Sequence, residues 1–105
     1  MDFTRAFIER EAFEADVREV ERELSGPVVH MSYDLDYDST GDPAVHFKIV
    51  LPDESFKRDK LLDEIQHVSY VVKQKLQPVV RWGVYPYFRF RSKSTYESSP
   101  EPGWG

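Results

Sequence analysis

The chain has 105 residues, of which 40% are hydrophobic and 31% are charged, and its formal net charge is −5. This length predicts one domain, because a second hydrophobic core would have too little chain, and the apolar content is that of a folded protein rather than a disordered one. The negative charge disfavours non-specific attraction to phosphate backbones and anionic lipid. Cysteine is absent, which excludes disulfides, zinc–thiolate sites, iron–sulfur clusters and thiol nucleophiles.

Residues 1–16 carry charges throughout and contain no apolar stretch of the kind found in a secretory signal. No segment approaches the ~20 apolar residues that a membrane-spanning helix needs. We therefore expect a cytoplasmic protein with no membrane contact.

Residues 3–24 are predicted to form a helix. Apolar side chains recur there at roughly helical spacing, with Glu and Arg in between: Phe3, Phe7, Phe13, Val17, Val20 and Leu24. Ser25-Gly26-Pro27 should end the helix, since glycine accepts the left-handed conformation after a helix and proline cannot continue it.

Residues 28–37 and 44–51 alternate between apolar and polar side chains with period two, which predicts two half-buried strands. The turn residues of 39–43 lie between them, so we expect a hairpin. In the expected register Asp36 faces His46 and Asp34 faces Lys48, which would place opposite charges across the strands.

A second helix is predicted over 54–76, with its end forced by Pro78. Its apolar stripe consists of Leu61, Ile65, Val68, Val72 and Leu76. Residues 82–92 alternate again and predict a third strand, and Pro86 favours a sheet edge because it cannot donate to a ladder. The domain is expected to span residues 1–92, and the Ser, Pro, Glu and Gly composition of residues 93–105 predicts a flexible C-terminal tail.

The order α-β-β-α-β predicts an α+β fold, a two-layer sandwich in which a three-stranded sheet carries both helices on one face. The other sheet face should then hold the polar strand residues. The predicted core follows the apolar phase of each element: Phe7, Val17, Val20, Tyr33, Leu35, Phe47, Ile49, Leu62, Ile65, Val72, Val84 and Phe88.

No pattern in the sequence indicates catalysis or a metal site. The aspartates between Asp34 and Asp42 suggest a calcium loop, but neither register supplies the Glu that an EF-hand needs at its twelfth position. The histidines His30, His46 and His67 have no recognisable nucleophile beside them. We expect no catalytic residue, no metal and no cofactor, and hence a protein that is not an enzyme.

The segment 81–93 contains cations and no acidic residue, and its arginines alternate on one strand face with tyrosines. Interleaved aromatic and cationic side chains can stack bases and neutralise phosphates, or can anchor a protein interface. They can also balance the aspartates of the first strand. The candidate binding residues are Tyr85, Tyr87, Arg89 and Arg91, together with His46 and Lys48 from the polar face of the second strand.

Two resemblances accompany these patterns. Residues 41–54, GDPAVHFKIVLPDE, and residues 85–92, YPYFRFRS, resemble a family of small bacterial proteins of uncharacterised function. This resemblance implies no activity or catalytic residue that can be carried over to the chain. The order of elements over residues 28–92 also resembles, in topology, the KH-like fold of ribosome-binding factor A. That likeness implies nucleic-acid binding, although residues 61–76 contain no glycine where a Gly-x-x-Gly element would be expected.

The sequence thus predicts a non-enzymatic interaction module whose open sheet face binds a protein partner or a second copy of itself. The alternative is a KH-like nucleic-acid-binding domain that uses the tyrosines and arginines of the last strand. A small hydrolase or nuclease built on His30, His46 and the aspartates is the third hypothesis. Salt dependence separates the first two, because phosphate binding weakens steeply with added salt.

Overall fold

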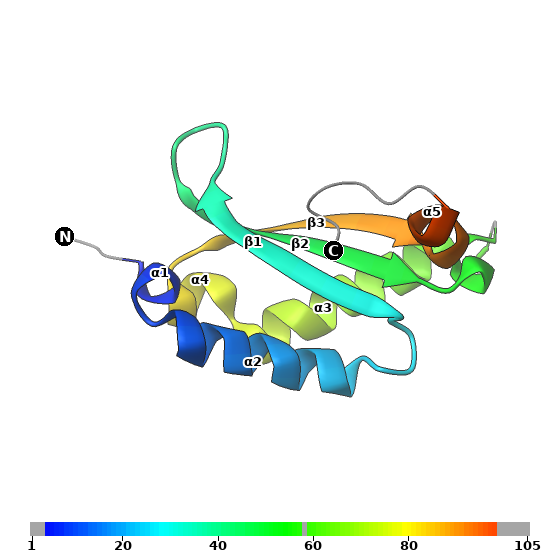
Figure 1. Ribbon diagram of the computed structural model, residues 1–105, viewed down its shortest axis with the longest axis horizontal. Helices are drawn as coiled ribbons and strands as arrows, with labels where there is room; N and C mark the ends of the chain where they lie inside the picture. The colour runs from blue at the N-terminus through cyan, green and yellow to red at the C-terminus, as the bar shows by residue number, and fades with distance from the viewer. Residues whose placement is uncertain (1–3, 58, 99–105) are drawn as a thin grey trace.

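The computed structural model describes residues 4–57 and 59–98. It confirms the α+β class, with helices packed against a three-stranded mixed sheet (Figure 1). The two long helices, α2 (Arg10–Glu23) and α3 (Leu61–Leu76), lie on the same face of the sheet, as predicted. No helix in these ranges combines the length and the apolar character that a membrane crossing requires.

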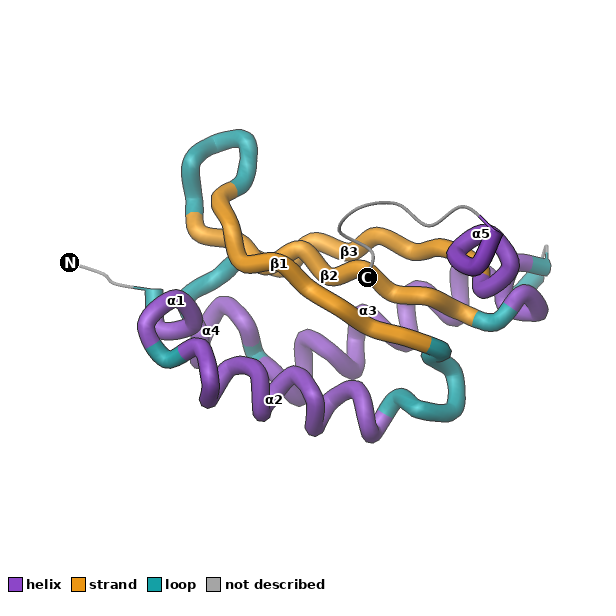
Figure 2. Tube along the Cα trace, viewed as in Figure 1, coloured by secondary structure: helices purple, strands orange, loops and turns teal. Residues whose placement is uncertain are grey.

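The sheet has the order β1-β2-β3, formed by His30–Tyr37, Pro43–Leu51 and Tyr85–Ser92 (Figure 2). The central strand β2 pairs antiparallel with β1 and parallel with β3. The predicted hairpin register was wrong by two residues, because Asp34 faces His46 and Asp36 faces Ala44. A shift of two leaves every side chain on its predicted face, since side chains alternate with period two.

The N-terminal helix is broken, which corrects the single helix predicted over 3–24. The chain forms α1 (Arg5–Ile8) and α2, separated at Glu9, whose φ of −106° and ψ of 61° lie outside the helical region. The break turns α1 so that Ala6 is buried and the Arg5 guanidinium lies 4.3 Å from the ring centroid of Trp82.

The second helical segment and the start of the last strand also differ from the prediction. Instead of one helix over 54–76, a 3₁₀ turn η1 (Asp53–Phe56) precedes α3. A further helix, α4 (Pro78–Trp82), follows α3 through Gln77, whose φ of 50° and ψ of 61° are left-handed. Proline suits the first position of a helix, where no N–H donor is needed. Trp82 therefore ends a helix rather than beginning β3.

Most of the residues predicted for the core are buried or pack against buried residues. Fully buried members include Val17, Phe47, Ile49 and Val72, whereas Leu62 is 65% exposed and was wrongly assigned. Its neighbour Leu61 packs against the core instead, because it lies seven residues before Val68 and so shares the buried face of α3.

Residues 93–98, expected to belong to a flexible tail, form the short helix α5 (Lys93–Ser98). The backbone N–H and the hydroxyl of Ser94 both donate to Asp53 Oδ1, at 3.0 and 3.1 Å, and hold α5 beside η1. The rest of the expected tail, residues 99–105, lies outside the described residues.

Candidate functional site

All six predicted binding residues lie on the sheet face opposite α2 and α3. The parallel register places His46 beside Tyr87 and Lys48 beside Arg89 on neighbouring strands. Tyr85 and Arg91 flank them along β3, opposite Ala44 and Val50. We call this group the open sheet face: Tyr85, Tyr87, Arg89, Arg91, His46 and Lys48.

The exposure of these side chains decreases from β3 toward the centre of the sheet. Tyr85 and Tyr87 are 48% and 44% exposed, and Arg89 is exposed as well. Lys48 on the central strand is only 9% exposed. The accessible part of the open sheet face is therefore its β3 side.

Lys48 is neutralised within the face. Its ammonium group forms an ion pair with the Asp34 carboxylate on β1. Because Asp34 faces His46 directly, this pair runs diagonally between the strands, within the reach of a lysine side chain. The same side chains line a shallow depression of about 480 Å³ that also includes Asp36, His46 and Arg89. Both signs of charge meet there, so the depression has no single-sign field to attract a polyanion.

Tyr87 has a structural role that the strand pattern could not reveal. Its hydroxyl donates a 2.8 Å hydrogen bond to Asp38 Oδ2, and its ring stacks on His46 with centroids 5.4 Å apart. Asp38 begins the β1–β2 loop, and its other oxygen accepts from the N–H of Thr40 and the N–H of Asp42 at 3.0 and 2.9 Å. Tyr87 thus ties the hairpin loop to the edge strand β3 across the sheet.

This network shifts two ionisations. The hydrogen bonds from Thr40, Asp42 and Tyr87 lower the pKa of Asp38 to about 2. The bond to Asp38 in turn raises the pKa of the Tyr87 hydroxyl above its ordinary value. At neutral pH the loop therefore presents a carboxylate beside the tyrosines, with the phenol as its donor.

The far end of the same face is covered by α5. His30 on β1 stacks on Tyr96 of α5 with ring centroids 5.5 Å apart, and α5 also contacts β2 and β3. Val50, on this face of β2, is fully buried. The cover of α5 lies over the His30 and Val50 end, and the most exposed part of the face is the end that carries Tyr85 and Tyr87.

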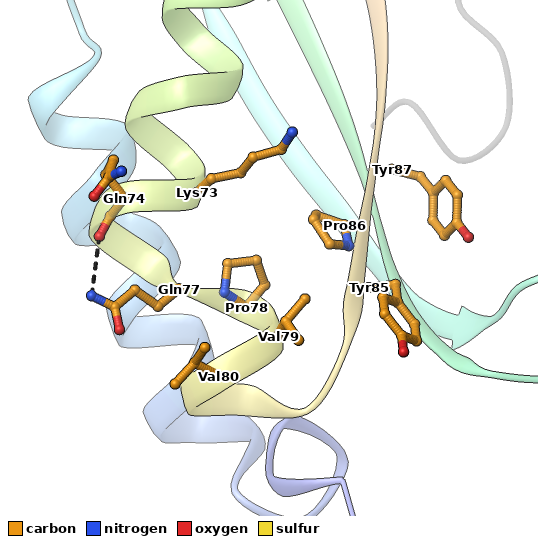
Figure 3. Close-up of a pocket in the computed structure, with 9 residues that line it drawn as sticks. All are labelled: Lys73, Gln74, Gln77, Pro78, Val79, Val80, Tyr85, Pro86 and Tyr87. Carbon is orange, nitrogen blue, oxygen red and sulfur yellow. Dashed lines mark hydrogen bonds between the residues drawn. The ribbon is translucent and has the colours of Figure 1, made fainter.

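A groove of about 600 Å³ runs along the other side of β3, between this strand and the helices α3 and α4 (Figure 3). Lys73 and Pro86 point into the space between α3 and β3, whereas Tyr85 and Tyr87 extend from the opposite side of the strand. The floor near α4 is apolar, with Pro78 beside Val79, which is 48% exposed. Sequence reasoning treated Pro78 only as a helix stop and missed the groove; the adjacent valines of 79–80 were its one visible signal.

The histidines and carboxylates are the side chains of this cysteine-free chain that could bind a metal ion. Among residues 4–57 and 59–98, no cluster of three or more His, Asp or Glu side chains is placed to hold a metal ion. The three histidines also remain apart in role: His30 stacks on Tyr96, and His46 on Tyr87, while His67 is exposed on α3.

No family model, curated protein or solved structure matches the chain. The two resemblances therefore stay predictions.

Proposed function

We propose that this protein is a non-enzymatic interaction module that binds another protein chain, either a second copy or a different protein, through the open sheet face. The observation that carries the proposal is the pair Tyr85 and Tyr87, each about half exposed beside Arg89 on an edge strand. Tyrosine and arginine are enriched at protein interfaces and contribute strongly when they are desolvated. The cysteine-free sequence fits a reducing compartment such as the cytoplasm, which we include in the proposal.

A KH-like nucleic-acid-binding role is the second candidate, favoured by the alternation of tyrosine and arginine along β3. Two carboxylates on or beside the same face favour a protein partner instead. Asp34 neutralises Lys48, and Asp38 lies within hydrogen-bonding distance of Tyr87. A phosphate backbone that approached this surface would meet those charges in addition to a net charge of −5.

The test is the double variant Tyr85→Ser with Arg89→Ser. Tyr85 is preferred to Tyr87 because the hydroxyl of Tyr87 holds the hairpin loop. Arg89 has an interaction partner inside the protein, so the melting temperature is measured alongside binding. The matched control replaces Tyr70, which is 62% exposed on α3, and Lys75, whose exposed pair with Glu23 is expected to contribute about 1 kcal/mol or less.

Association is measured by sedimentation velocity over a range of protein concentrations and by capture of partners on the immobilised protein. A single-stranded RNA is titrated in parallel at low and high salt. We expect the Tyr85→Ser/Arg89→Ser variant to melt near the wild-type temperature and to lose protein association, which the control variant retains. Wild-type binding of RNA that weakens steeply with salt, with no protein association, would replace the proposal by the nucleic-acid alternative. Wild-type protein that binds neither would refute both.

A further inference from the structure

In the part of the chain that the structure describes, β3 pairs with β2 alone, so the backbone groups on its outer edge are not used by another strand of the sheet. Hydrogen bonds elsewhere fix which residues these are. The N–H of Asp38 donates to Asp42 O, and the N–H of Val29 donates to Val50 O, both at 2.8 Å. The even-numbered residues of β2 therefore direct their backbone groups toward β1, and its odd-numbered residues, such as Phe47, direct theirs toward β3.

In a parallel pair, a residue bonds to the two neighbours of the residue that it faces. Phe47 faces Phe88, so Tyr87 and Arg89 turn their backbone groups toward β2. The N–H and C=O of Phe88 then point away from β2, toward the outer edge of the sheet. Those of Phe90 point the same way, because backbone groups alternate along a strand. Val84, in the same phase, does donate its N–H outward, to Pro78 O in α4 at 3.0 Å.

The open edge is compatible with strand pairing. Pro86 lies in the outward phase, where its missing N–H costs no bond to β2. Beside it, the groove of about 600 Å³ separates this end of β3 from α3 and α4, so that the helices do not fill the space along the strand (Figure 3). An added strand would thus meet the N–H groups of Phe88 and Phe90 without displacing a helix.

We propose that the partner at this edge is a second copy of the chain, whose β3 pairs antiparallel with the first about a twofold axis at Phe88. This inference rests on the proposed function and names the partner of the same strand. The pairing is self-complementary: Tyr87 faces Arg89 of the second copy, and Tyr85 faces Arg91 of the second copy. Each guanidinium then meets an aromatic ring on the open sheet face, which is an attractive pairing.

The neighbouring registers are poorer. An axis at Arg89 would set two guanidinium groups directly opposite each other, and like charges in that position are destabilising. An axis at Tyr87 would pair Phe90 with Val84 of the second copy, whose N–H already donates to Pro78. With the axis at Phe88, the N–H of Phe88 reaches the carbonyl of its counterpart, and the N–H of Phe90 reaches the carbonyl of Pro86. Both open donors are then used.

Lys73 gives the dimer a distinctive salt response. Its ammonium group lies 5.9 Å from the ring centroid of Phe88, on the helix side of the sheet. Near a twofold axis at Phe88 the two copies of Lys73 approach each other, and their repulsion is screened by salt. Added salt should therefore leave the association unchanged or tighten it, and Lys73→Gln should tighten it at low salt.

Cysteine cross-linking tests the register, since the chain has no cysteine of its own. In the variant Tyr85→Cys with Arg91→Cys, the thiol at position 85 of one copy faces the thiol at position 91 of the other copy. These residues form a pair without mutual backbone hydrogen bonds, with Cα atoms about 4.5 Å apart, within the range of a disulfide. The matched control, Tyr85→Cys with Arg89→Cys, places no thiols directly opposite. Sedimentation measures the association itself, in the unmodified protein and in Tyr85→Arg. The control is Val29→Arg, directly before β1 on the opposite side of the sheet.

We expect a reversible dimer in the unmodified protein, rapid cross-linking of the Tyr85→Cys/Arg91→Cys variant on mild oxidation, and at least a tenfold weaker dimer in Tyr85→Arg alone. Circular dichroism verifies that each variant is folded. A protein that stays monomeric up to millimolar concentration, or cross-links only in the control pair, overturns the inference. If that monomer still binds a different protein through Tyr85 and Arg89, the inference fails and the proposed function stands. If it binds nothing, both fail.

Discussion

Replacing Trp82 by alanine should remove a large part of the stability of this domain. The indole is 1% exposed and meets the Phe13 ring edge-on, with centroids 5.2 Å apart. Its Nε1 donates to Asp16 Oδ2 at 3.1 Å, and the Arg5 guanidinium covers one ring face. Truncating a buried Trp costs about 3–5 kcal/mol, and the aromatic pair and the cation place this site toward the upper end, at about 4–5 kcal/mol. Domains of this size are stable by about 5–15 kcal/mol in total.

The variant Trp82→Phe separates the contribution of the aromatic ring to stability from that of the indole N–H. It keeps an aromatic ring against Phe13 and removes the N–H donor, while Asp16 retains its ion pair with Arg81 at 3.0 Å. We expect a loss of about 1–2 kcal/mol, the sum of a smaller buried ring and one hydrogen bond. Val80→Ala, an 84% exposed neighbour in α4, serves as the control and should change stability by less than about 0.5 kcal/mol.

Urea unfolding followed by far-ultraviolet circular dichroism measures all three variants. The peptide backbone dominates this signal, so the unfolding transition can still be followed after the substitution. The slope of the free energy against urea should match that of the wild type, which indicates an unchanged folded state. A loss below about 1 kcal/mol for Trp82→Ala would show that Trp82 lies on the surface, as an end residue of an edge strand could, and would refute the α4 assignment.

Other substitutions test the core, the hairpin loop and the α3–α4 junction. Phe47→Ala should cost about 3–5 kcal/mol and Leu62→Ala less than about 0.5 kcal/mol in the same urea assay, because only Phe47 is buried. Asp38 has a folded pKa of about 2, below its ordinary value of 3.8, so its contribution to stability is present above about pH 4 and is lost as the pH falls through 2. Carboxyl NMR titration should find this midpoint in the wild type and a higher one in Tyr87→Phe; equal midpoints would show that the phenol does not bond the carboxylate. Gln77→Gly should raise stability by up to about 1 kcal/mol, since glycine adopts the left-handed conformation at no steric cost, and a loss would contradict a positive φ there.

The strands and their faces could be predicted from the sequence, because apolar and polar side chains alternate along a half-buried strand. Alternation alone placed Tyr85 and Arg89 on one face and Phe47 on the other. The register could not be predicted with the same certainty, since a shift of two residues keeps the same faces. The register depends on how the loop closes, and it is fixed by the hydrogen bond from the Asp38 N–H to Asp42 O.

The segment after α3 was mispredicted for a local reason. Pro78 ends one helix and begins the next, and both roles are consistent with its fixed φ. The residue at the junction is Gln77, a type that seldom adopts the left-handed conformation, so residue 77 itself gave no signal that a second helix follows. Trp82 and Val84 then happened to fit the alternation of the following strand.

For the candidate site, the alternation of side chains predicted which residues share a sheet face, but not the contacts between them. The stacking of Tyr87 on His46 depends on parallel pairing between strands separated by α3 and α4, which no local pattern specifies. The bond from Tyr87 to Asp38 joins residues 49 positions apart and depends on how the loop folds back over the sheet. The α5 segment KSTYES has no apolar period that could predict a helix, and its contacts include the ring of Tyr96 stacked on His30 and polar bonds from Ser94.

The position of β2 at the centre of the mixed sheet affects how the protein can be synthesised. The β1–β2 hairpin can form as soon as residue 51 leaves the ribosome, because its contacts are local. The other edge of β2 and the cover of Phe47 depend on residues 85–92, which emerge only after α3 and α4. Until then the nascent chain presents an unpaired, apolar strand edge, the state most prone to aggregation or to chaperone capture. Chain fragments that end before residue 85, and therefore lack β3, should remain in this open state.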